Sequence, residues 1–338
     1  MSVDSFRPPT ISHLSYGMFT DCRRRWLYRY CCDHLPYPSQ TVWEIKRQTK
    51  LVPWATFSGK VVDHVISLAL NEFRSTQTWP ADLHCLAKDA ASYWYRFSQH
   101  WLREVRTIGA RWPEHPDFQP LDVHFYDVPP PVEEINAVRD KYRQCLDGYL
   151  SSPIRAKIEA SDPARWRGPR QEGEDLPRFV LDGVTVYAVY DFAIQDDGLL
   201  SIYDWKTGDL TAQSEARVLD QLHWYALYAI EAWQVPIESI RLVPVWLANL
   251  GIANQVEVDD KAIERLRSRI KQRYLEIYQL LHLDEGGAID LAEWPVTEKH
   301  WLCDTCQFRG TCEGAQRKSA EADPGGIDPF RDAHGEIQ

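Results

Sequence analysis

Two aspartates and a lysine lie on the two sides of a predicted β-hairpin. The segments 179–194 and 199–205 are rich in Val, Tyr and Ile and are joined by Gln-Asp-Asp-Gly. An Asp-Gly pair favours a two-residue type I′ turn. That turn would place Asp191 opposite Asp204, and Lys206, two residues farther along, would project from the same face. The hairpin therefore predicts two carboxylates and one ammonium clustered on a sheet surface.

This cluster has the composition of a metal-dependent hydrolytic site. Two nearby carboxylates repel each other unless a proton or a cation lies between them. Mg²⁺ and Mn²⁺ prefer oxygen ligands and keep waters for a substrate phosphate. Lys206 could orient or help deprotonate the attacking water, or stabilise charge that develops at phosphorus. Phosphodiester hydrolysis is the reaction that these groups suit, and a cross-strand ion cluster without chemistry is the alternative.

A second polar pair follows on a predicted helix. Gln221 and Tyr225 are four residues apart, so they share one helical face. Their amide and phenol groups could reach a phosphate or Lys206. A solvated helix face is the alternative interpretation.

Four of the eight cysteines have informative positions. Cys303, Cys306 and Cys312 form a C-x2-C-x5-C motif that can converge on one metal centre. The fourth ligand must come from elsewhere; we favour Cys22, with Cys31 or Cys32 as substitutes. A triplet with one remote cysteine fits an iron–sulfur cubane better than a zinc ribbon, although spacing alone leaves both open. A centre held by Cys22 would join the two ends of the fold.

The elements that must position these residues follow a mixed α/β plan. A helix is expected over 12–32, with Ser12 or Ser15 as its N-cap. Residues 61–150 are predicted to be mostly helical. Residues 151–178 are rich in Pro and Arg and are predicted to be irregular. Beyond the hairpin, the pattern predicts helices at about 213–233 and 260–282, strands at 240–247 and 255–258, and a disordered tail after Cys312.

The composition limits the kinds of partner and the cellular location that we expect. The chain has 38 Lys and Arg against 49 Asp and Glu, a net charge of −11. This balance weighs against non-specific coating of nucleic acid, but it leaves room for a local basic groove such as the one that Arg23, Arg24 and Arg25 would form. We find neither a signal-peptide pattern nor an apolar run long enough to cross a membrane, so we expect a cytoplasmic protein with no membrane partner.

These motifs, taken in order, resemble a known family. Asp191…Asp204-Trp-Lys206 resembles the core motif of the PD-(D/E)XK nucleases, and Gln221-x-x-x-Tyr225 resembles the motif that follows it in the RecB-like branch. Cys22 with the C-terminal triplet is similar to the iron-staple members of that branch, which include AddB-type nucleases and the nucleases of CRISPR spacer acquisition. The segment from Ser15 to Tyr28 also resembles theirs.

The resemblance implies a fold. We expect a restriction-endonuclease-like mixed central sheet flanked by helices, with a helical insertion or N-terminal lobe and an iron–sulfur staple that joins the two ends. The predicted division is a basic segment with one cluster ligand (1–60), a mainly helical region (61–178), the nuclease core (179–285), the cysteine region (286–314) and the tail (315–338).

The resemblance also implies an activity and its residues. It implies a structural 4Fe-4S cluster on Cys22, Cys303, Cys306 and Cys312, and metal-dependent DNA cleavage on single strands or ends, in the manner of an exonuclease. Carried over by position, Asp191 and Asp204 would bind Mg²⁺ or Mn²⁺, and Lys206 and Gln221 would serve catalysis. Tyr225 would contact the substrate, and Arg23, Arg24 and Arg25 would guide its phosphates.

Two departures from the family pattern stand out. Family members carry Gly-x-x-x-His at a helix start, and that His helps to hold the metal. Here Gly59 is followed by Asp63 at the His position and by His64 one residue later. One residue rotates a helical side chain by about 100°, so both cannot face the site equally; we retain both and favour His64 slightly. The second departure is at Tyr190 and Ala188, where Pro and Gly often precede the first Asp.

Two other functions are compatible with the same motifs. The chain could be a DNA-end-binding subunit with dispensable activity inside a larger repair, recombination or defence complex. It could also be a zinc-stapled regulatory protein, which metal content and colour would distinguish. A helicase, recombination or adaptation partner is expected with either nuclease role, because this chain has no P-loop.

Overall fold

The central element of the protein is a mixed β-sheet. The computed structural model describes residues 9–108, 119–169 and 174–314, so the tail 315–338 lies outside the described residues. Parallel pairing occurs between β6 and β7, and their other partners run antiparallel. The sheet order is β2-β5-β6-β7-β8, with β9 also on β7, and the strands are β2 (Trp166–Arg167), β5 (Phe192–Asp196), β6 (Leu199–Lys206), β7 (Ile240–Trp246), β8 (Ile252–Ala253) and β9 (Val256–Glu257).

The β5–β6 hairpin has the predicted register. Phe192 pairs with Tyr203, and Asp197 and Gly198 both have positive φ, as a type I′ turn requires. The long strand expected over 179–194 is wrong, because a second Asp-Gly turn at Asp182 interrupts it. That segment forms β3 (Arg178–Leu181) and β4 (Val184–Tyr187) before β5, and both join β1 (Ile11–Ser12) in a three-stranded sheet.

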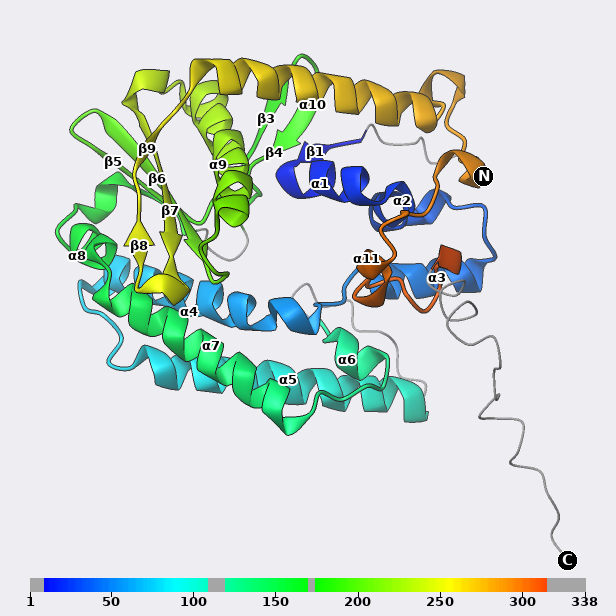
Figure 1. Ribbon diagram of the computed structural model, residues 1–338, viewed down its shortest axis with the longest axis horizontal. Coiled ribbons are helices and arrows are strands. Elements are labelled where there is room, and N and C mark those ends of the chain that lie inside the picture. The colour runs from blue at the N-terminus through cyan, green and yellow to red at the C-terminus, as the bar shows by residue number, and fades with distance from the viewer. Residues whose placement is uncertain (1–8, 109–118, 170–173, 315–338) are drawn as a thin grey trace, which may run out of the picture.

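Helices cover both faces of the central sheet (Figure 1). The parallel strands β6 and β7 are connected by α9 (Ala212–Trp233), against which α10 (Asp260–Leu280) packs. The opposite face is covered by α4 (Phe57–Thr76), α5 (Leu83–Ile108), α7 (Val132–Ser151) and α8 (Pro153–Glu159). The presence of α8 and β2 corrects the prediction that 151–178 is irregular.

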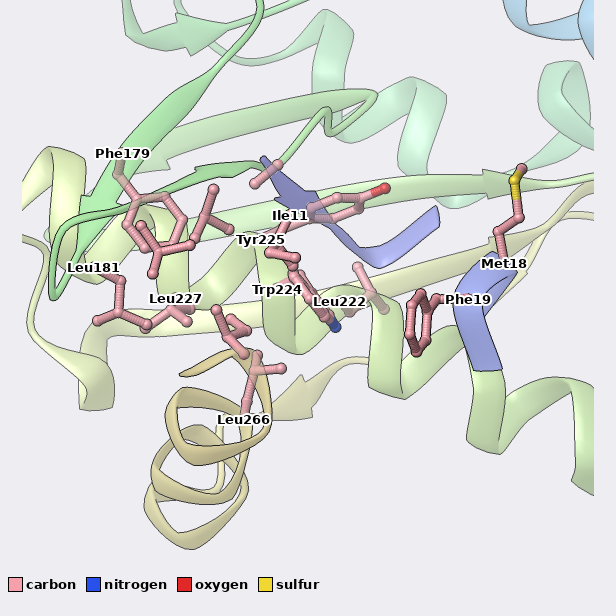
Figure 2. Packing of buried hydrophobic residues seen from close by; sticks show 14 of the residues in the cluster. Ile11, Met18, Phe19, Phe179, Leu181, Leu222, Trp224, Tyr225, Leu227 and Leu266 are labelled. Carbon is pink, nitrogen blue, oxygen red and sulfur yellow. The ribbon is translucent and has the colours of Figure 1, made fainter. Parts of the chain in front are cut away.

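The alternation of side chains along β6 divides the interior into two cores. Leu200 and Ile202 face α9, whereas Tyr203 and Trp205 face α4 and α7, because successive side chains of a strand point to opposite faces. Figure 2 shows the first core, where residues of α9 meet β1, β3 and α10. Asp204 and Lys206 continue the Leu200–Ile202 row and therefore lie on the α9 side.

The N-terminal helix is interrupted at Cys22. Ser12 caps α1 (His13–Asp21), and Ser15 completes a capping box with it. Cys22 is extended and ends α1, and its sulfur caps a new helix by accepting a hydrogen bond from the backbone N–H of Arg25. The continuous helix predicted over 12–32 is therefore wrong: the chain forms α1 and α2 (Arg23–Tyr30), followed by α3 (Ser39–Gln48).

The C-terminal segment lies against these N-terminal helices (Figure 1). The rings of Trp26 and Trp294 stack with centroids 5.6 Å apart. Gln48 of α3 donates a hydrogen bond to Thr311 at 2.8 Å. The segment contains α11 (Trp301–Asp304), and it also contacts α6 (Asp122–Phe125), where the Tyr126 hydroxyl donates to the carbonyl of Gln307. Direct contacts between side chains and backbone thus pack the two ends of the fold together.

None of the described helices combines the length and apolar character that crossing a lipid bilayer requires.

Candidate active site

Three carboxylates from three elements gather at one end of the central sheet. Asp191 directly precedes β5, Asp204 lies on β6, and Asp63 lies on α4. Asp204 is buried at 1% exposure, Asp191 is partly exposed, and Asp63 is exposed to solvent. Burial raises the pKa of Asp191 well above its usual range, and the charges of Asp204 and Asp63 raise it further. The three side chains are therefore close enough to repel one another when ionised.

The first aspartate is held by the strand that carries the second. The backbone N–H of Trp205 donates a hydrogen bond of 2.7 Å to Asp191 Oδ2. Sequence reasoning missed this contact, because a backbone donor leaves no trace in residue type. It fixes Asp191 beside Asp204, as the hairpin register predicted.

Lys206 connects the carboxylates to α9. Its ammonium forms an ion pair with Asp204 and donates a hydrogen bond of 2.9 Å to Gln221 Oε1. Gln221 Nε2 in turn donates to the Tyr225 hydroxyl at 2.5 Å. The predicted i, i+4 pair thus faces the site and not solvent. One polar chain runs from Asp204 through Lys206 and Gln221 to Tyr225.

Asp63, and not His64, faces the acidic cluster. Desolvation raises the pKa of Asp63, and the charge of Asp204 raises it further. The His64 ring packs against Trp94 at 4.8 Å, and burial followed by the Lys60 charge lowers its pKa. The slight preference for His64 is therefore not supported by the geometry. Gly59 brings α4 to this position, since a Cβ there would lie 3.1 Å from Thr207 Oγ1.

The oxygen donors suit a divalent cation. Burial raises the pKa of Asp204, although the ion pair that Lys206 forms with Asp204 Oδ2 opposes the shift. A hard cation would relieve the repulsion among three carboxylates and prefers oxygen ligands. As the side chains stand, the described part of the chain holds no group of three or more His, Cys, Asp or Glu arranged as a metal site.

Comparison with known families places the chain in a superfamily. A family model that describes the PD-(D/E)XK nuclease superfamily matches residues 71–313. The chain belongs to the PD-(D/E)XK nuclease superfamily. The match spans the hairpin, Lys206, α9 and the cysteine triplet, and it confirms the expected restriction-endonuclease-like fold. No curated protein matches the chain.

Two of the three arginines that were predicted to guide phosphates, Arg23 and Arg24, have different environments. Arg24 is buried at 4% exposure and donates to the backbone carbonyls of Trp294 and Leu291 at 2.8 and 2.7 Å. A guanidinium engaged in this way ties α2 to the C-terminal segment and is not free for DNA, which corrects the prediction for Arg24. Arg23 forms an ion pair with Glu276 and remains partly exposed.

The four predicted cluster ligands surround one cavity. Cys22, Cys303, Cys306 and Cys312 all line it, together with Arg25 and Arg309, and its other walls are mainly apolar. Cys31 and Cys32 do not line it, and burial raises the pKa of the Cys31 thiol to about 12. The structure thus selects Cys22 as the N-terminal thiol of the group. Cys22 lies at this cavity because it occupies the junction between α1 and α2, where it caps α2.

Proposed function

We propose that the protein is a Mg²⁺- or Mn²⁺-dependent deoxyribonuclease that digests single-stranded DNA or DNA ends as an exonuclease. The observation that carries the proposal is the grouping of Asp63, Asp191 and Asp204 beside Lys206. Structural ion clusters alternate in sign, whereas this group has three carboxylates beside one ammonium, and one of the carboxylates, Asp204, is buried. That excess is expected where a cation and a phosphate are to be bound.

The residues of the site would have different roles in hydrolysis. Asp63, Asp191 and Asp204 would hold the cation, which when bound supplies Lewis acidity and a nucleophilic water. Lys206 is oriented by Asp204 and Gln221, so its ammonium is placed to position the water and to stabilise charge on the phosphate. Tyr225 accepts its hydrogen bond from Gln221, so its own proton remains available for a substrate oxygen.

Single strands and ends suit this site better than intact duplex. The chain carries a net charge of −11, and a strongly acidic surface repels the broad phosphate face of a duplex. A single strand or a strand end, in contrast, needs positive charge only along one narrow track.

We further propose that Cys22, Cys303, Cys306 and Cys312 bind a structural 4Fe-4S cluster. Four ligands of one zinc ion lie about 2.3 Å from it and are therefore close together. A cubane attaches each cysteine to a different iron, so its ligands are more widely spaced. The four thiols line one cavity, and a close triplet with one remote cysteine fits the cubane better than a zinc ribbon. A cytoplasmic location would keep these thiols reduced, and a separate helicase or recombination protein would supply DNA unwinding.

The nuclease proposal is tested with end-labelled single-stranded DNA, Mg²⁺ or Mn²⁺, and anaerobically purified protein. Wild type is expected to digest the DNA, and Lys206→Ala is expected to lose at least about 100-fold in rate. Lys271→Ala removes an exposed lysine paired with Asp182 and should retain full activity. If wild type binds DNA ends but cuts nothing, with Lys206→Ala identical, the protein is the end-binding subunit instead.

The choice between the two α4 candidates gives a second prediction. Asp63→Ala should lower cleavage by more than about 100-fold, beyond the loss typical of an outer-shell partner. His64→Ala should change it by no more than a few-fold, because the ring packs on Trp94. Rates at increasing Mn²⁺ concentration provide the measurement, since loss of a cation ligand shifts the metal requirement upward. The reverse order of the two variants would assign the role to His64.

A further inference from the structure

An aromatic cluster adjoins the proposed catalytic residues and has no part in the mechanism above. The ring of Tyr190, which directly precedes Asp191, lies 5.3 Å from Trp233 and 6.0 Å from Tyr228. Tyr228 and Trp233 lie 4.9 Å apart near the end of α9. Tyr190 also contacts Tyr225 at 6.5 Å, so the cluster is continuous with the Lys206–Gln221–Tyr225 chain.

The cluster lies at the edge of the core and not inside it. Tyr190, Tyr228 and Trp233 are each partly accessible to solvent, and the neighbouring Val189 is 47% exposed. Rings that only fill a core are normally covered on all sides. These three present polarisable surface beside a carboxylate that would hold a substrate phosphate through its cation.

Positive charge accompanies the rings. The guanidinium of Arg167 lies over the Trp233 ring at 4.5 Å. Arg167 pairs with Ala193 across β2 and β5, and so faces α9 as Ala193 does. Arg74 also lies near Tyr190, and Glu174 offsets part of the charge. Planar cations on aromatic rings are a common arrangement where single-stranded nucleic acid is bound.

The loop before this cluster is shaped to approach it closely. Gly168 has a φ of +83°, and a Cβ there would lie 3.2 Å from the Asp191 carbonyl oxygen and 3.4 Å from the Tyr190 ring. A residue with a side chain would be strained in that backbone conformation. Glycine therefore lets the loop that carries Arg167 lie directly against Tyr190.

We propose that Tyr190, Trp233 and Tyr228 form a stacking subsite for the base of a nucleotide next to the scissile phosphate, with Arg167 binding its neighbouring phosphate. This inference rests on the proposed nuclease function and names the part of the substrate that the site recognises. Every base has a π-face, so the subsite is tolerant of sequence but requires an unpaired base. It would favour single strands and frayed ends over duplex.

The experiment compares binding of a single-stranded oligonucleotide with binding of oligonucleotides in which one base at a time is removed to leave an abasic site. Binding is measured by fluorescence anisotropy with EDTA present, so that cleavage plays no part, and cleavage is measured separately with Mn²⁺. For wild type, one or two positions should show a loss of roughly tenfold in affinity when the base is absent.

The variants are Trp233→Ala and Tyr190→Leu, with Tyr93→Ala on α5 as a matched control. Tyr93 is 61% exposed and lies on a helix that packs against the opposite face of the sheet. Each subsite variant should bind intact DNA roughly tenfold more weakly and should no longer distinguish the abasic oligonucleotide. Tyr190→Phe keeps the ring and should behave as wild type, and thermal melting verifies that the variants are folded.

The possible results distinguish a failure of the stacking subsite from a failure of the proposed nuclease function. Equal losses on intact and abasic DNA would show that the rings only support the fold, and would overturn the subsite while leaving the nuclease intact. The subsite would also be overturned if wild type cleaved DNA but lost no affinity when any single base was removed. Wild type that neither binds nor cleaves DNA would overturn the proposed function and the subsite together.

Discussion

In the metal-free protein, Asp191→Asn is expected to raise thermal stability while abolishing DNA cleavage. Asparagine keeps an oxygen that can accept the hydrogen bond of the Trp205 N–H, and it removes one of three mutually repelling charges. The gain at neutral pH should be about 2 kcal/mol, the order of one repulsion between nearby charges in a partly solvated site. Cleavage should become undetectable, because the cation loses a ligand.

The pH dependence of this gain has a definite sign. Folding raises the pKa of Asp191, so the folded state favours the protonated carboxyl. The stability that this proton contributes to wild type is lost as pH rises through the folded pKa. The advantage of Asp191→Asn in free energy of unfolding should therefore be small below about pH 4 and grow toward neutrality.

Chemical denaturation at several pH values provides the measurement. Asp175→Asn, at a side chain that is 95% exposed, is the matched control and should show no such trend. Added Mg²⁺ should stabilise wild type more than the variant, since only wild type retains the full ligand set. A variant less stable than wild type at every pH would contradict the account of the site as an excess of negative charge.

Cys306→Ser is expected to remove the iron–sulfur centre and to lower the melting temperature by roughly 10 °C. The proposed cluster joins α2 to the C-terminal segment, so its binding free energy adds to that of folding. Cys85→Ser is the matched control, because Cys85 is exposed on α5 and does not line the cavity. That variant should keep the visible absorption and the stability of wild type.

Iron, sulfide and zinc analysis of anaerobically purified protein decides the identity of the centre. Four irons and four sulfides per chain would support the cubane, and one zinc per chain without colour would replace it. Because Arg24, Trp26 and Gln48 hold the C-terminal segment independently, Cys306→Ser should still fold. Its DNA cleavage therefore reports whether the centre has a role beyond stability.

Local patterns in the sequence were enough to predict the hairpin that carries the candidate catalytic residues. An Asp-Gly turn requires positive φ at both positions, and the period of two along a strand then determines which residues share a face. Asp191, Asp204 and Lys206 follow from these two rules. The helical period likewise places Gln221 and Tyr225 on one face of α9. These relations act over a few residues and depend little on the rest of the fold.

Contacts between distant segments were decided by the tertiary structure alone. Whether Asp63 or His64 faces the site depends on how α4 rotates against β6, and Gly59 sets that approach through Thr207. A basic run in the sequence does not distinguish a buried Arg24 from a partly exposed Arg23, because burial depends on where the C-terminal segment packs. The hairpin was determined by the sequence because its geometry is local, whereas these side chains acquire their roles only from partners brought near by folding.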